Sequence, residues 1–162
     1  LAAFAVSGIG REWPGYLADL ALLLLTTNLF NLLDLRPGRV EKALVLVLAG
    51  VCAGAWTIFP LQLLGVFIGP LLVGAALTLR ERAMLGDCGA NLAGAVAGVA
   101  LFAALGTEAR LIALAVVALL TIYGEFRSIS AGIDRLAPLR ALDRIGRLED
   151  PPAQSPGSQP AR

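Results

Sequence analysis

Apolar runs separated by short polar connections occupy most of the chain, and this pattern predicts five membrane-spanning helices. The first span reaches about 27 Å at 1.5 Å per residue, close to the roughly 30 Å thickness of the hydrocarbon layer. The expected fold class is therefore an all-α, polytopic membrane helix bundle. The spans are residues 16–33, 43–59, 60–79, 89–105 and 111–126.

Small residues recur at intervals of four within these spans. In lipid, such residues let helix backbones approach closely, so they predict packing faces rather than isolated anchors. The positions are Gly50 and Gly54, Gly65 and Gly69, and Ala90, Gly94 and Gly98.

Lysine and arginine are distributed unequally between the two sides of the membrane. With loops assigned alternately and the terminal Arg162 left out, ten lie on one side and two on the other. The richer side is predicted to be cytoplasmic. The two groups are Arg36, Arg39, Lys42, Arg80, Arg82, Arg127, Arg135, Arg140, Arg144 and Arg147 against Arg11 and Arg110.

Four regions follow from these patterns. Residues 1–15 form a short extracytoplasmic piece, and 16–126 form the transmembrane bundle. Residues 127–148 repeat apolar positions with interleaved arginines, which predicts an amphipathic segment in the cytoplasmic interface. Residues 149–162 are rich in Pro, Ser, Gln and Gly and are expected to be a disordered tail. The chain begins with Leu, from which we expect a fragment or an incomplete gene model rather than a signal peptide.

Composition narrows the class of protein. Hydrophobic residues make up 57% and charged residues 15%, whereas soluble domains have roughly 45–50% and about 25%. Cys52 and Cys88 are far apart, so no disulfide framework and no zinc site are expected. Histidine is absent, which excludes mechanisms in which this chain supplies an imidazole base.

The end of the first span carries one candidate site. Asn28, Asn31 and Asp34 are three residues apart and project from one side of a helix. Their oxygens suit Mg²⁺, which takes one or two carboxylates and completes its shell with water and substrate phosphates. Alternatively, the asparagines join helices and Asp34 merely ends the span.

A second candidate lies in the segment Met84–Asn91, where Asp87 is flanked by glycines that admit a bulky anionic ligand. As an alternative, Asp87 caps the following helix, which is worth about 1 kcal/mol. Arg36 and Arg39 could attract phosphate and anionic lipid, or serve only as the orientation signal. Glu125 is expected to pair with Arg127 or another arginine on the same side.

Together these stretches resemble the polyprenyl-phosphate N-acetylhexosamine-1-phosphate transferase family, which includes the phospho-N-acetylmuramoyl-pentapeptide transferase of peptidoglycan synthesis. NLFNLLD is similar to the family's N-x-x-N-x-x-D segment, and MLGDCGANLAG to its M-G-D-x-G-S-x-x-L-G segment. The segment YGEFRSISAGIDRLAPLRALDRIGR is similar to its closing helix and loop. The resemblance covers about residues 17–147 and only the family's C-terminal half.

The resemblance implies a Mg²⁺-dependent plasma-membrane enzyme of cell-wall or surface-polysaccharide synthesis. It would move a phospho-N-acetylhexosamine from a UDP-sugar to a polyprenyl phosphate and release UMP. Asp87 and Asp34 would be catalytic and, with Asn31, would hold the metal, while Asn28, Asn31, Arg36 and Arg39 would bind substrate. The expected partners are both substrates, the membrane and the missing N-terminal half, with no nucleic acid.

Several positions depart from the family. The usual D-G-L-D-G-L-A continuation is replaced by residues 34–40, which lose an acidic position and gain arginines. Met84 replaces an aromatic that can stack on uracil, and Leu139–Leu142 replace a triple-histidine loop. The adjacent aspartate pair of the N-terminal half has no counterpart, so we expect this chain alone to be inactive. The alternatives are a non-catalytic relative that binds polyprenyl phosphate or nucleotide, and an unrelated small membrane transport or assembly subunit.

Overall fold

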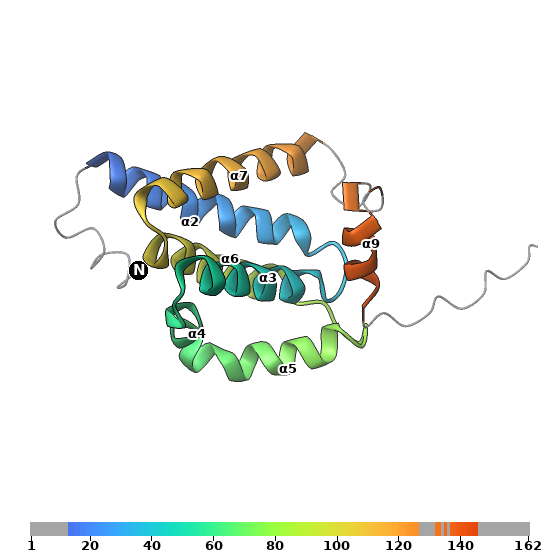
Figure 1. The fold of residues 1–162 in the computed structure, drawn as a ribbon. Helices are drawn as coiled ribbons and strands as arrows, with labels where there is room; N and C mark the ends of the chain where they lie inside the picture. Colours follow the sequence, from blue (N-terminus) through green and yellow to red (C-terminus); the bar gives the residue numbers. More distant parts are fainter. Residues whose placement is uncertain (1–12, 127–131, 134, 136, 146–162) are drawn as a thin grey trace, which may run out of the picture.

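The computed structural model describes residues 13–126, 132–133, 135 and 137–145, without the side chains of residues 13, 59, 63, 66, 68 and 144. Within this part the fold is all α-helical and contains no strand, which confirms the expected fold class of a membrane helix bundle (Figure 1). The helices are α2 (Trp13–Leu33), α3 (Arg39–Ala55), α4 (Phe59–Leu64), α5 (Ile68–Thr78), α6 (Gly86–Ala104), α7 (Thr107–Phe126) and α9 (Ala137–Arg144), with the 3-10 turn η1 (Gly65–Phe67).

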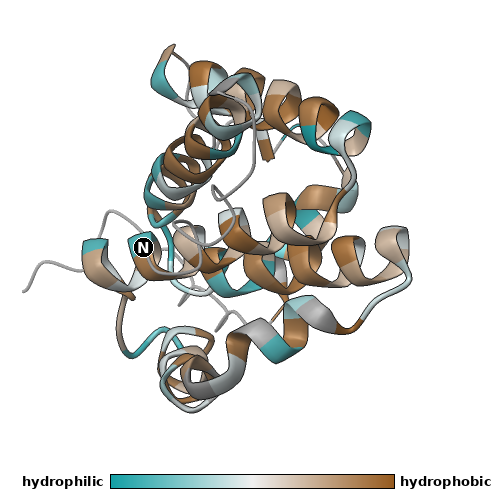
Figure 2. Ribbon diagram, turned by 90° about the vertical axis from the view of Figure 1, so that its left-hand side faces the viewer, coloured by the Kyte–Doolittle hydropathy of each residue, from teal (hydrophilic) through white to brown (hydrophobic). Residues whose placement is uncertain are grey.

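Three helices are long and apolar enough to cross a membrane, judged by length and composition: Pro14–Leu33 within α2, Gly86–Ala104 as α6 and Thr107–Phe126 as α7. They coincide within a few residues with the first, fourth and fifth predicted spans. Hydrophobic residues predominate along the helices of the bundle (Figure 2). The described helices thus support a membrane location, while the side that each loop faces stays a prediction.

The second and third predicted spans differ from the structure. α3 has 17 residues and includes three charged residues in its first turn, so its apolar part is shorter than 43–59. The prediction of one continuous helix over 60–79 is wrong, because the chain turns between α4 and α5. Gly65 adopts φ 36° and ψ −113° at this break, a backbone conformation that residues with a side chain rarely adopt. α5 then has only 11 residues, about 16 Å.

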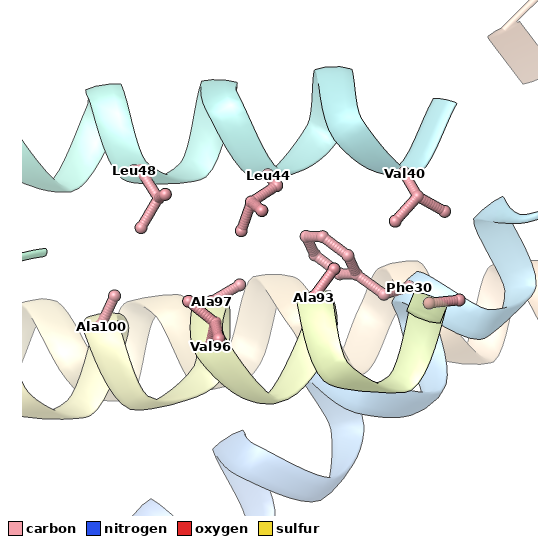
Figure 3. Packing of buried hydrophobic residues seen from close by; sticks show 9 residues of the cluster. Phe30, Val40, Leu44, Leu48, Ala93, Val96, Ala97 and Ala100 are labelled. Atoms are coloured by element: carbon pink, nitrogen blue, oxygen red, sulfur yellow. The ribbon is translucent and has the colours of Figure 1, made fainter. Parts of the chain in front are cut away.

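Helix α6 lies at the centre of the bundle and contacts both α2 and α3. Leucines of α3 face a row of alanines on α6, and Phe30 of α2 completes this cluster (Figure 3). A second cluster joins α2, the end of α6 and α7 through Leu22, Phe102 and Val117. Small side chains on α6 therefore allow larger ones from two neighbouring helices to pack closely.

The glycine pattern is only partly explained by packing. A Cβ atom at Gly94 would lie 2.7 Å from the Thr27 Cα atom, and one at Gly98 would lie 3.1 Å from the Leu23 Cα atom. The predicted face on α6 is therefore confirmed. No described atom lies within 4 Å of a Cβ built at the other predicted positions, so those intrachain packing faces are wrong: Gly50, Gly54, Gly65 and Gly69.

One buried ion pair lies inside the spans. Arg110 of α7 donates through Nη1 to the Asp19 Oδ1 atom of α2 at 2.9 Å, and through Nη2 to the Leu105 carbonyl at 3.3 Å. Asp19 is 1% exposed and Arg110 is 9% exposed. The hydropathy pattern included both positions in or beside apolar runs without predicting this link between α2 and α7.

Candidate functional site

The two sequence motifs meet at one end of the bundle. Asp34 directly follows α2, and the backbone N–H of Gly86, the first residue of α6, lies near its carboxylate and lowers its pKa. The first N–H groups of a helix lack partners within the helix, so the start of α6 carries a partial positive charge near Asp34. Gly86 has φ 71°, a backbone conformation that glycine adopts readily and residues with a side chain rarely adopt. The contact brings Asp34 and Asp87 near each other.

Electrostatics also couple the carboxylates at this end. Burial raises the pKa of Asp34 above its ordinary value, the Gly86 backbone N–H lowers it, and the nearby Glu41 and Asp87 carboxylates raise it. Asp34 is half-buried, whereas Asp87 is exposed. These groups form an acidic cluster, which we define as Asp34, Glu41 and Asp87.

A protein-only metal cage is not present in the part of the chain that the structure describes. No group of three or more His, Cys, Asp or Glu side chains there is arranged to hold a metal ion. The proximity of Asp34 and Asp87 fits a less complete donor set, in which a hard cation takes one or two carboxylates and further oxygens from water and substrate phosphates.

The two asparagines occupy different positions. The Asn28 Nδ2 atom donates to the Glu125 Oε1 atom at 3.2 Å, which joins α2 to the end of α7. This contact agrees with the alternative in which Asn28 joins helices. Asn31 is half-buried, and its backbone carbonyl accepts the Asp34 N–H at 3.2 Å. Glu125 thus has Asn28 as a described partner, while its predicted partner Arg127 lies outside the described residues.

The predicted phosphate-binding arginines face a carboxylate of the same chain. Arg39 is buried and donates from Nε and Nη2 to the two carboxylate oxygens of Asp143 in α9, at 2.6 and 3.2 Å. Arg36 Nη1 lies 3.6 Å from Asp143 Oδ2. Lys42 Nζ donates to the backbone carbonyl of Asp143 at 2.9 Å. The turn after α2 and the first turn of α3 are therefore joined to α9, the last helix that the structure describes.

Glu41 is the residue of this region that sequence analysis missed. It is buried, and its Oε1 atom accepts a hydrogen bond from the Thr78 hydroxyl at the end of α5. No described group forms a hydrogen bond to its Oε2 atom. Glu41 also lines an apolar pocket of about 140 Å³ between α3 and the α4–α5 segment. A carboxylate one turn before an apolar run was the available sequence signal.

The two cysteines and the predicted amphipathic segment remain to be located in the structure. Cys88 is an exposed free thiol beside Asp87, whereas Cys52 in α3 is a half-buried free thiol. The predicted amphipathic segment is represented by α9 and a few preceding residues. Its remaining positions, residues 1–12 of the predicted extracytoplasmic piece 1–15 and the predicted tail 149–162 lie outside the described residues, while residues 13–15 belong to α2.

No protein-family model, curated protein or solved structure matches the chain. The assignment to the phospho-sugar transferase family accordingly stays a prediction based on sequence motifs.

Proposed function

We propose that this chain is part of a membrane transferase that moves a phospho-N-acetylhexosamine from a UDP-sugar to a polyprenyl phosphate. The supporting observation is that the Gly86 N–H and the Asp87 carboxylate lie close enough to the Asp34 carboxylate to affect its pKa. The Asn-Asp segment at the end of α2 and the Gly-Asp segment at the start of α6 therefore lie together. These are the two segments on which the resemblance to the transferase family depends, and they are far apart in the sequence.

In this proposal Asp34, Asp87 and Asn31 would hold Mg²⁺, which would supply positive charge to the reacting phosphates. The chain's own part is to fix Asp34 against the start of α6. Asn28 and Asn31 orient the ligand, and the partly exposed Arg36 offers its guanidinium to a phosphate. Arg39 would have to exchange Asp143 for substrate.

The reaction forms a bond between an oxygen of the polyprenyl phosphate and the sugar-bearing phosphorus of the UDP-sugar. The bond from that phosphorus to the bridging oxygen breaks, and UMP leaves with that oxygen. This chain has no histidine to act as a base. The adjacent aspartate pair that the resemblance implies would come from the proposed N-terminal half.

The chemistry is tested by co-expressing the chain with a polypeptide that carries the adjacent-aspartate half. UMP release is then measured with UDP-N-acetylhexosamine, polyprenyl phosphate and Mg²⁺. Asp87→Asn should abolish turnover and Asp34→Asn should reduce it severely. Glu81→Gln, a change of an exposed carboxylate in the α5–α6 connection, is the matched control. Full activity in Asp87→Asn, or activity unaffected by a chelator, would overturn the proposed metal site.

A binding test needs only this chain. Cys88 is exposed beside Asp87, so bound UDP-sugar and Mg²⁺ should slow its reaction with a maleimide. The half-buried Cys52 serves as the internal control and should react at an unchanged rate. Asp87→Asn should remove the protection of Cys88. An equal rate at Cys88 with and without ligand in the native chain would argue against nucleotide binding at this end.

One observation favours a second candidate, a non-catalytic protein that binds polyprenyl phosphate or nucleotide. The loop that is acidic in the transferase family carries Arg36 and Arg39 here, and both contact Asp143. Ligand protection of Cys88 without UMP release from the assembled halves would support this candidate over the transferase.

A further inference from the structure

Three cationic side chains converge on one residue of the C-terminal helix. We define the α3–α9 junction as Arg36, Arg39, Lys42 and Asp143. Arg39 holds both carboxylate oxygens of Asp143, Arg36 lies 3.6 Å from one of them, and Lys42 binds the backbone carbonyl. The fork of a guanidinium binds carboxylate and phosphate oxygens with the same paired geometry. Asp143 therefore occupies a position that a phosphate group could take.

An apolar pocket of about 100 Å³ lies beside these charges. Arg39, Lys42 and Asp143 border it, almost wholly through their apolar atoms. Apolar side chains from the end of α2, from α3, from α9 and from the segment before α9 line the rest: Leu33, Ala43, Leu46, Ile133, Leu139 and Leu142. An apolar cavity beside a group of cations matches an amphiphile that has an anionic head and an apolar chain.

The location agrees with such a ligand. The junction lies where α2 ends and α3 begins, at the end of the bundle that also holds α9 (Figure 1). Basic pockets between membrane helices near their ends are typical sites for anionic lipid headgroups. The chain of the lipid would continue along the apolar surface of α3, where Val45 and Leu46 are exposed.

Helix α9 can move away from the bundle more readily than the other helices. It has eight residues, and most of its described side chains are exposed. The ion pair with Arg39 and the leucines at the pocket join it to α3. An isolated helix of this length is marginal in water, so its position depends on these contacts.

We propose that the α3–α9 junction binds the phosphate of an anionic phospholipid, and that Asp143 is an internal competitor for this site. When the lipid phosphate binds Arg36 and Arg39, the Asp143 carboxylate leaves the guanidinium of Arg39 and α9 moves away from α3. The acyl chain then lies between Leu46 and the side chains exposed by α9. This proposal does not depend on the transfer reaction, because it concerns lipid binding alone.

The test measures binding of short-chain phospholipids to the purified chain in neutral detergent by native mass spectrometry. Dioctanoyl phosphatidylglycerol should bind, whereas dioctanoyl phosphatidylcholine, which has the same chains and no net charge, should bind at least about tenfold more weakly. Asp143→Asn should raise the affinity for phosphatidylglycerol by about tenfold, because it removes the competing carboxylate. Glu81→Gln removes an exposed carboxylate elsewhere on the chain and should leave the affinity unchanged.

Two arginine variants test whether loss of a cation weakens lipid binding. Arg39→Gln should abolish the preference for phosphatidylglycerol. Arg36→Gln should weaken it, and because Arg36 is partly exposed this variant serves if Arg39→Gln fails to fold. Inorganic phosphate in excess should compete poorly, because it lacks the chain that fills the pocket.

Equal affinity of the native chain and Asp143→Asn for phosphatidylglycerol would overturn the role of Asp143. Equal binding of the two lipids, or displacement of the lipid by inorganic phosphate at equal concentration, would overturn the lipid site. Since UMP release is not a readout here, these results are separate from the test of the transferase.

Discussion

Replacing Gly94 by alanine should separate α2 from α6. A Cβ atom at this position would lie 2.7 Å from the Thr27 Cα atom, 2.9 Å from the Phe30 Cβ atom and 3.0 Å from the Thr26 carbonyl oxygen. Two of these neighbours are backbone atoms, which cannot rotate away. Carbon atoms pack at about 3.5–4.0 Å, so the helices must move apart locally by about 1 Å.

The expected cost is that of an overpacked core. Inserting a methyl group into a well-packed site typically costs about 1–3 kcal/mol. A gap of 0.5–1 Å also forfeits about a quarter to a half of each dispersion contact that it opens. Alanine gains up to about 1 kcal/mol over glycine from helix propensity in water, which offsets part of this cost. We expect Gly94→Ala to lower the free energy of unfolding by about 1–3 kcal/mol.

Gly50→Ala is the matched control. Gly50 lies inside α3, and no described atom comes within 4 Å of a Cβ built there. The same change of one methyl group should therefore leave the stability unchanged or raise it slightly.

The assay is unfolding of both variants in mixed micelles with increasing dodecyl sulfate, followed by circular dichroism. Equal free energies of unfolding for Gly94→Ala and Gly50→Ala would refute the close approach of α2 and α6. Greater loss of stability in Gly50→Ala would place an essential contact at a surface that is open in the described chain.

Three further predictions concern charge and topology. Arg110→Ala should destabilise the bundle by about 3–5 kcal/mol, because it leaves the buried Asp19 without this partner. The double variant Asp19→Asn/Arg110→Ala should cost less than Asp19→Asn and Arg110→Ala together, and additive effects in unfolding measurements would contradict the coupling. A membrane-impermeant maleimide should label the exposed Cys88 from the cytoplasmic side, and labelling from the outer side of intact cells would reverse the predicted orientation. A peptide of residues 133–148 should gain helicity on anionic vesicles, and an unchanged circular dichroism spectrum would count against an interfacial segment.

Sequence periodicity predicted the long helices well because their signal is local. Apolar runs that approach the membrane thickness in length have few alternatives in lipid, and α2, α6 and α7 lie close to the expected ranges. The break in 60–79 was missed because Gly65 was interpreted as a packing residue. Its positive φ instead lets the chain turn, and the prolines at 60 and 70 lie near the starts of α4 and α5.

The candidate site was predicted only in outline. The spacing of Asn28, Asn31 and Asp34 and the setting of Asp87 indicated two polar segments, and the structure brings Asp34 to the start of α6. The partners of the charged groups were not predictable from one sequence. Asp143 follows Arg39 by 104 residues in the chain, and Arg110 follows Asp19 by 91. No local pattern encodes such pairs, although an aspartate within an apolar run does indicate that a partner exists.

The pair of Asp19 and Arg110 has a consequence for biosynthesis. The two residues belong to the first and last of the three long helices, so Asp19 enters the membrane well before Arg110 is synthesised. A charged aspartate at the centre of a span opposes insertion by about 2.5–3.5 kcal/mol, and by less near an end. Until α7 is synthesised, the first span carries this penalty without the ion pair to Arg110. Stable insertion of α2 is thus expected to follow translation of α7. In a chain truncated before Arg110, a smaller fraction of the first span should be inserted in the membrane.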